Sequence, residues 1–284
     1  MANDGLNWTI PCMRAGYAGR GIAYVAVAGF SLYALWRGRQ AEGPGEVFDA
    51  LGRSFWGDAV LMLIALGMTA YFVWRVVCAV YDLEDYGTDI KGLIARGGQI
   101  TTGTIHLGLG AVAAIAAFTV DEKGDGGGSI EKIASQVIAM PMGWVILGAA
   151  GIVTVIAGGY YLKKAITRDY QKTLRSCEIT RNWNLVLEAG IAAQGFVVLM
   201  IGAFLARAAY SANAGDAGGM GDVFDMLATQ VYGQLMVTAC CLGLLAFAVF
   251  CFVNSGYRII PKLNHGDMDT LRSWAKDKAK EATA

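Results

Sequence analysis

GGQITTGTIHLGLGAVAAIAAFTV, residues 97–120, carries no formal charge when His106 is neutral. A helix needs about 20 mostly apolar residues to cross the hydrocarbon core of a bilayer, and its backbone polar groups must be bonded within the segment. The run is therefore predicted to be a membrane-spanning helix. Five more stretches qualify, and the six predicted spans lie near residues 17–36, 57–80, 99–120, 142–162, 185–206 and 231–253.

The composition agrees with a chain whose solvent is lipid. Of its 284 residues, 55% are hydrophobic and 16% charged, whereas about a quarter of a soluble domain is charged. The net charge is zero, so nucleic acid is not an expected partner. Six cysteines form no C-x-x-C pair and there are only two histidines, so neither a metal site nor a cofactor is predicted.

The Lys and Arg residues are divided unequally between the two sides of the predicted membrane. Sixteen lie on the side that holds both termini and six on the opposite side. Cytoplasmic loops carry the excess of positive charge in membrane proteins. Both termini are therefore predicted to be cytoplasmic, and the first span is predicted to be an uncleaved membrane helix.

The chain repeats a two-helix unit three times. Segments before the second span of each unit are alike: VFDALGRSFWG (47–57) and VFDMLATQVYG (223–233) share Val, Phe, Asp, Leu and a closing glycine, and IASQVIAMPMG (133–143) keeps that glycine. The first span of each unit carries two glycines five residues apart. The glycines expected to allow close helix packing are Gly16, Gly21, Gly98, Gly103, Gly190 and Gly195 in the first spans, and Gly57, Gly143 and Gly233 at the start of the second spans.

These repeats predict the architecture. The units are expected at residues 13–87, 90–174 and 180–261, followed by a basic tail at 262–284. Because each unit crosses twice, its copies share one orientation, and they are expected to surround a pseudo-threefold axis along the membrane normal. In the segments before the second spans, apolar residues recur at i and i+4, which predicts short helices in the outer interface. The fold class is an all-α integral membrane protein.

The pattern resembles a bacterial membrane family, domain of unknown function 1206, in which a two-helix unit occurs three times. The resemblance covers about residues 13–261. It rests on the R-x-G-(x)4-G opening at Arg14 and Arg96 and on the glycine that begins each second helix. The third unit departs from it, with Glu188 in place of arginine. The family implies a multi-pass protein of the bacterial inner membrane and implies no activity.

Superposing the repeats brings polar residues to equivalent positions. Arg14, Arg96 and Glu188 form one set, predicted to make ion pairs at the cytoplasmic mouth. Two further sets lie four residues apart and so share a helix face. Their polar members form the candidate polar column: Arg20, Tyr24, Thr102, His106 and Gln194. Polar groups inside a membrane often mark pathways, but they also hold helices together. Arg75 is expected to snorkel beside Trp74 toward the interface.

Two functions remain open. The polar column favours a protein that binds or passes a small solute or ion along the repeat axis. The alternative is a non-catalytic scaffold or accessory subunit, for which the partners would be another membrane protein or a second copy of the chain. No nucleophile–base or metal constellation is present in the sequence, so an enzyme is not expected.

Overall fold

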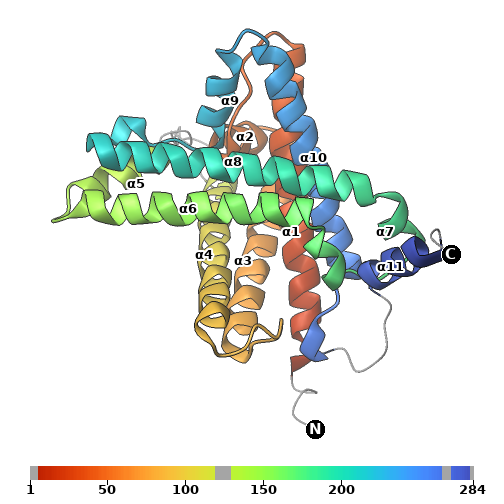
Figure 1. Cartoon of the computed structure of the whole chain (residues 1–284). Helices are drawn as coiled ribbons and strands as arrows, with labels where there is room; N and C mark the ends of the chain where they lie inside the picture. The colour runs from red at the N-terminus through yellow and green to blue at the C-terminus, as the bar shows by residue number, and fades with distance from the viewer. Residues whose placement is uncertain (1–5, 119–128, 264–269, 282–284) are drawn as a thin grey trace.

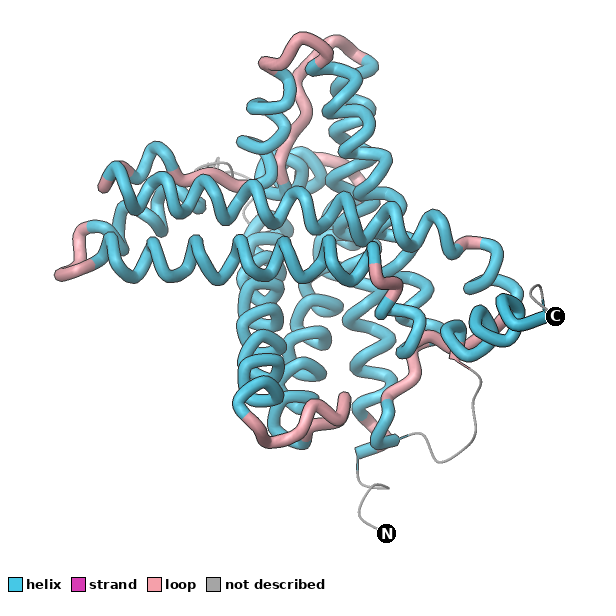
Figure 2. Tube along the Cα trace, viewed as in Figure 1, coloured by secondary structure: helices cyan, strands magenta, loops and turns pink. Residues whose placement is uncertain are grey.

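A computed structural model of the chain describes residues 6–118, 129–263 and 270–281, and every regular element in this part is a helix (Figures 1 and 2). Six helices are long and apolar enough to cross a membrane. They are α1 (Thr9–Trp36), α3 (Gly57–Tyr81), α4 (Ile90–Phe118), α6 (Gly143–Ile166), α8 (Asn184–Ser211) and α10 (Gly233–Tyr257). The six predicted spans are thus confirmed. The glycine-rich loop DEKGDGGGS begins at residue 121, and most of it lies outside the described residues.

Two of the helices begin well before the predicted spans. α1 begins at Thr9 and not near residue 17, and α4 begins at Ile90 and not near residue 99. The hydropathy pattern marks only the part that suits hydrocarbon, whereas a helix continues until its backbone bonding ends. The charged residues Arg14 and Arg96 therefore lie on these helices and not in loops.

A short helix precedes the second span of every unit. These helices are α2 (Pro44–Gly52), α5 (Ser129–Ile138) and α9 (Met220–Ala228). After each, a turn leads into a glycine whose N–H donates to the carbonyl three residues earlier, at 3.0 Å for Gly57 and 2.9 Å for Gly143 and Gly233. The same backbone turn therefore occurs in all three units. The location of the three short helices in the outer interface stays a prediction.

The spans pack in an open series, in the order α4, α3, α1, α10, α8, α6. In Figure 1, α6 and α8 lie side by side and run across the α3–α4 pair. Within the described residues, α4 and α6 make at most a marginal contact with each other, although they belong to one unit. The predicted pseudo-threefold arrangement is therefore not confirmed.

Glycine contacts explain this order. A Cβ added to Gly158 of α6 would lie 2.5 Å from the backbone nitrogen of Leu199 in α8. A Cβ added to Gly110 of α4 would lie 2.8 Å from the Met68 side chain in α3. Both spans of the second unit thus make their closest approaches to spans of other units, because that is where their small residues allow contact.

The helix ends on the side of the two termini are joined by backbone bonds, and this side is called the terminal side below. Ile259 N–H donates to Thr173 at 2.8 Å, and Arg175 N–H donates to Tyr257 at 2.9 Å. The tail helix α11 (Leu271–Glu281) is anchored by Leu271, which is buried and whose N–H donates to Leu174. The tail therefore packs on the loop between α6 and α8, which contains η3 (Asp169–Thr173) and α7 (Glu178–Asn182).

Candidate functional site: a buried arginine cluster

Arg20 lies near the middle of α1 with its side chain enclosed. The residue is 2% exposed. Its Nη1 donates a hydrogen bond of 2.9 Å to the hydroxyl of Tyr71, and its guanidinium carbon lies 4.9 Å from the Tyr71 ring centre and 5.2 Å from that of Phe247. Among the described residues Arg20 has no acidic partner, and its Nε has no hydrogen-bond acceptor. A buried cation with neither is energetically costly.

The Tyr71 hydroxyl joins two arginines. It accepts a bond from Arg20 and a second one, of 3.0 Å, from Nε of Arg75 one turn further along α3. The close approach of α1 and α3 depends on Gly16, where a Cβ would lie 2.6 Å from the Tyr71 Cα. The glycine therefore positions the tyrosine between the two guanidinium groups.

His106 of α4 lies against the same tyrosine. Its ring centre is 5.0 Å from that of Tyr71, and its Nδ1 lies 2.7 Å from the carbonyl oxygen of Thr102. This contact requires a proton on Nδ1, and Nε2 is then an acceptor when the ring is neutral. Nε2 is buried and has no partner in the structure.

The predicted polar column is only partly assembled. Arg20 and His106 both contact Tyr71. Tyr24 lies beside Arg20, whose guanidinium carbon is 5.9 Å from the Tyr24 ring centre. The Thr102 hydroxyl turns back to the carbonyl of Gly98, at 2.7 Å. The Gln194 carbonyl oxygen on α8 is buried without a hydrogen-bond donor. The structure shows no bond from either of these side chains to the arginines.

Gln99 is a buried polar residue that the superposition of repeats does not select. Its side chain is 4% exposed, and both atoms of its amide lack partners. It is seven residues before His106, so the two lie on one face of α4. A search for polar residues on the His106 face would have found it.

The three residues predicted at the cytoplasmic mouth have partners other than one another. Nε of Arg96 donates to the carbonyl of Ala79 at 2.6 Å and so caps the end of α3. Glu188 forms an ion pair of 2.8 Å with Arg168. Arg14 is exposed, and its carbonyl accepts a bond from Ser255.

A buried ion pair on the terminal side was not predicted. The carboxylate of Glu84 is 6% exposed and lies 2.5 Å from Nη2 of Arg258 and 3.8 Å from Nη1 of Arg75. Burial opposes its ionisation, but the two arginines outweigh burial and lower the pKa of Glu84 to about 2. Glu84 and Arg258 are 174 residues apart in the sequence, and no local pattern joins them.

Positive charge is in excess around this pair. Lys164 of α6 interacts electrostatically with Arg20, Arg75 and Arg258. Glu84 is the shared acidic partner of Lys164, Arg75 and Arg258. A neighbouring group is separate from it: Nζ of Lys262 lies 2.8 Å from Asp82 and 3.6 Å from Asp85. We call one group of residues the arginine cluster: the four cations Arg20, Arg75, Lys164 and Arg258, together with Tyr71 and Glu84. With four cations and one carboxylate, it is suited to a negatively charged ligand.

The glycines expected to allow close helix packing differ in what surrounds them. A Cβ on Gly21 would lie 2.7 Å from the Phe252 ring, and one on Gly195 would lie 2.9 Å from Tyr161. A Cβ on Gly103 or Gly190 would lie 3.0 Å or 2.4 Å from the nearest atom of a neighbouring helix. Gly98 has nothing within 4 Å of its Cβ position. It lies on a face of α4 that packs against no helix, so its repeat position does not imply a packing role.

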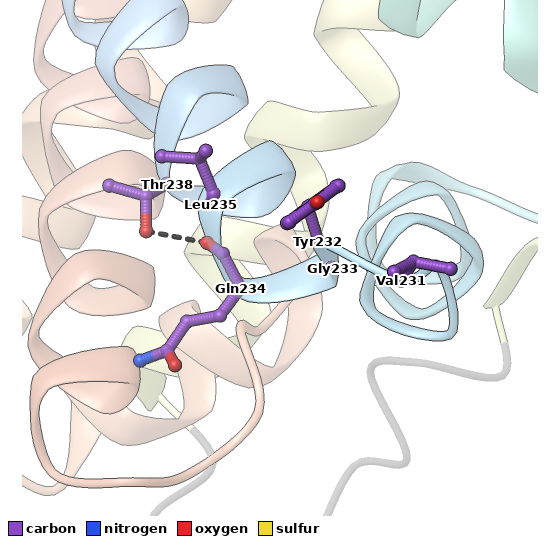
Figure 3. A pocket seen from close by; sticks show the side chains of 6 residues that line it. All are labelled: Val231, Tyr232, Gly233, Gln234, Leu235 and Thr238. Carbon is purple, nitrogen blue, oxygen red and sulfur yellow. Dashed lines mark hydrogen bonds between the residues drawn. The ribbon is translucent and has the colours of Figure 1, made fainter.

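A surface hollow lies away from the arginine cluster. A pocket of about 450 Å³ at the start of α10 is lined by Val231–Leu235 and Thr238 (Figure 3). It holds no charged side chain, and the Thr238 hydroxyl is bonded to the carbonyl of Gln234, at 2.7 Å. The pocket therefore offers less specific chemistry than the arginine cluster.

Six apolar helices in three two-helix units, with ionisable groups buried among them, define a multi-pass membrane protein. The family model of the Domain of Unknown Function DUF1206 matches residues 15–82, 97–168 and 189–258. The chain belongs to this family, and the resemblance inferred from the repeats is confirmed. It is also similar to the uncharacterized protein YxxB of Bacillus subtilis (strain 168), with 23% identity over 249 residues, which is 86% of this chain and 90% of that protein. No solved structure matches.

Proposed function

We propose that this protein binds a small solute or ion inside the membrane, at the arginine cluster, and provides for its passage. The observation that carries the proposal is Arg20, a guanidinium 2% exposed with no acidic partner among the described residues. Structural ion pairs explain Arg258 and Glu84, but they leave Arg20 unexplained. Ionisable residues in this situation commonly mark a ligand site or pathway.

The cluster connects to the terminal side, where both termini are proposed to be cytoplasmic. Fifteen of the 23 Lys and Arg residues belong to that side when Arg20, near the middle of α1, is left out, in accord with the charge bias of inner-membrane proteins. A solute would then enter from the cytoplasm through the region of Glu84 and Arg258. The bilayer is the inner membrane of a bacterium, and the proposed role is binding and not catalysis.

A solute panel with reconstituted protein tests this function. Purified protein in nanodiscs is screened by thermal unfolding against small anions, cations and neutral solutes, because a ligand that binds the native state raises its stability. At least one solute should stabilise the wild type and fail to stabilise Arg20→Gln. If no solute does so, and liposomes with and without protein release all of them at equal rates, the proposal is wrong.

The scaffold alternative has one observation in its favour. α6 ends the open series, and several of its large apolar residues are exposed, among them Ile146, Ile152 and Ile156. A partner helix could cover this face in place of lipid. Extraction in a mild detergent, followed by mass spectrometry of the intact particle, would then show a co-purifying membrane protein. A particle of one chain with lipid would contradict the scaffold.

A further inference from the structure

We propose that the ligand of the arginine cluster is a small anion that binds at Nε of Arg20, with Arg75 nearby across the Tyr71 hydroxyl, and that Glu84 is an internal counter-ion that competes with it. This inference rests on the proposed function and gives its ligand a chemical class. Three observations carry it: the arrangement of the cations, the donor left free on Arg20, and the position of the single shared carboxylate.

The cations lie at successive depths from the terminal side. Arg258 follows the end of α10, and Arg75 is six residues, about 9 Å, from the end of α3. Arg20 is 11 residues beyond Thr9, about 16 Å along α1. The Tyr71 hydroxyl links the two deeper arginines through bonds of 2.9 and 3.0 Å. An anion that enters from the terminal side thus meets positive charge at each step.

Arg20, the deepest of these cations, has an unbonded hydrogen-bond donor. Nε of Arg20 is buried and unbonded, and the aromatic rings of Tyr71 and Phe247 stabilise its charge without accepting that hydrogen. A bound anion would satisfy this donor and neutralise the charge at once. His106 is not counted as a ligand, because its free nitrogen is an acceptor in the neutral ring.

The site favours a free anion over a lipid headgroup. Arg20 is near the middle of its helix and 2% exposed, so a headgroup at the interface does not reach it. The surrounding helices approach closely, since a Cβ on Gly103 would lie 3.0 Å from the Arg75 side chain. Limited space beside the unbonded Nε of Arg20 indicates an ion of the size of chloride or nitrate.

Glu84 compensates positive charge in the cluster when no anion is bound. Its carboxylate contacts Arg258 and Arg75 and lies at the entrance of the cation series. An incoming anion takes over the charge compensation of Arg75, and Glu84 remains with Arg258. Replacing Glu84 by glutamine removes the competitor, so anion binding should become stronger, whereas Arg20→Gln should weaken it.

The test is thermal unfolding in nanodiscs of phosphatidylcholine, with sodium chloride or sodium nitrate exchanged against sodium gluconate at constant ionic strength. Chloride or nitrate should raise the unfolding temperature of the wild type. Binding should be at least ten-fold weaker in Arg20→Gln and stronger in Glu84→Gln. The matched control is Arg37→Gln, which removes an exposed arginine directly after the far end of α1, 5.9 Å from the Tyr33 ring centre. This variant should bind as the wild type does.

Several results would overturn the inference. Equal unfolding temperatures in the three salts, or an anion effect unchanged in Arg20→Gln, exclude an anion at this site. Stabilisation that appears only when phosphatidylglycerol is added identifies a lipid headgroup as the ligand. If Arg20→Gln does not fold, bromide titrated against the tryptophan fluorescence of the wild type and of Glu84→Gln decides: saturable quenching must be stronger in the variant. A neutral or cationic solute that binds in an Arg20-dependent way refutes the anion and leaves the proposed function standing.

Discussion

At the scale of single residues, the protein buries charge in two different ways. Glu84 and Arg258 are 6% and 4% exposed, and each compensates the other. Arg20 is equally buried and relies on one tyrosine hydroxyl and on aromatic rings. Both arginines keep a buried Nε without an acceptor, but only Arg258 has a carboxylate partner among the described residues. This difference separates the structural part of the cluster from the part that is available to a ligand.

Removing the Glu84 carboxylate should destabilise the protein in an anion-free buffer. Glu84→Gln leaves Arg258 buried without its counter-charge, and breaking a buried pair in this way costs about 3–5 kcal/mol. Unfolding by denaturant in gluconate buffer measures the loss. Glu178→Gln, at an exposed position in α7, should change stability by less than about 0.5 kcal/mol. Equal stability of both variants would show that the Glu84 pair contributes nothing.

The same carboxylate predicts an acid-sensitive range. Its pKa is about 2 in the folded protein, against 4.5 for an ordinary glutamate. A lowered pKa means that the stabilisation is fully present above about pH 4.5 and is lost as the pH falls through about 2. The unfolding temperature of the wild type, followed from pH 7 to pH 2, should therefore drop more steeply below pH 4.5 than that of Glu84→Gln. Parallel curves would contradict this role.

At the scale of elements, the glycine turn before each second span was the most informative sequence feature. The shared segments at 47–57 and 223–233 predicted short helices that lead into the glycine of the next span, and the structure has a short helix followed by such a glycine in all three units. In each, a Cβ on the glycine would overlap the carbonyl of the preceding short helix. Repetition reveals such a turn because its geometry is local. It did not reveal Glu84 with Arg258, which depends on how distant segments meet.

Alanine at these turns should disrupt the junction. Gly57→Ala and Gly233→Ala place a methyl group against the carbonyls of Leu51 and Ala228, and relieving such an overlap costs about 1–3 kcal/mol. Gly98→Ala is the control, since nothing lies within 4 Å of its Cβ position and alanine favours a helix. Thermal unfolding should rank Gly98→Ala at or above the wild type. Three equal unfolding temperatures would refute the turn.

At the scale of the whole molecule, the order of the spans differs from the symmetry that the repeats predict. Identical units were expected to surround an axis, yet the order α4, α3, α1, α10, α8, α6 is open. Periodicity and hydropathy find the spans, but they do not determine which faces meet. Glycines on α6 and on α8 allow these two helices to approach closely. The contact of α1 with α10 brings the first and last spans together.

Cross-linking distinguishes the two arrangements. In a cysteine-free background, cysteines at Gly21 and Phe252, where a Cβ on the glycine would lie 2.7 Å from the ring, should cross-link α1 to α10 in membranes. A pair at Gly108 and Thr154, on the middle parts of α4 and α6, should not cross-link. Efficient cross-linking of the second pair alone would contradict the open series and support a closed ring of three units.

The position of an anion in the folded protein can be observed through bromide, which substitutes for chloride and scatters anomalously. Crystals grown from a lipid mesophase in sodium bromide should show an anomalous peak beside Nε of Arg20. The peak should be stronger in Glu84→Gln, because the competing carboxylate is gone. Peaks confined to exposed cations such as Arg37, with none at Arg20, would show that the buried arginine cluster only holds the helices together.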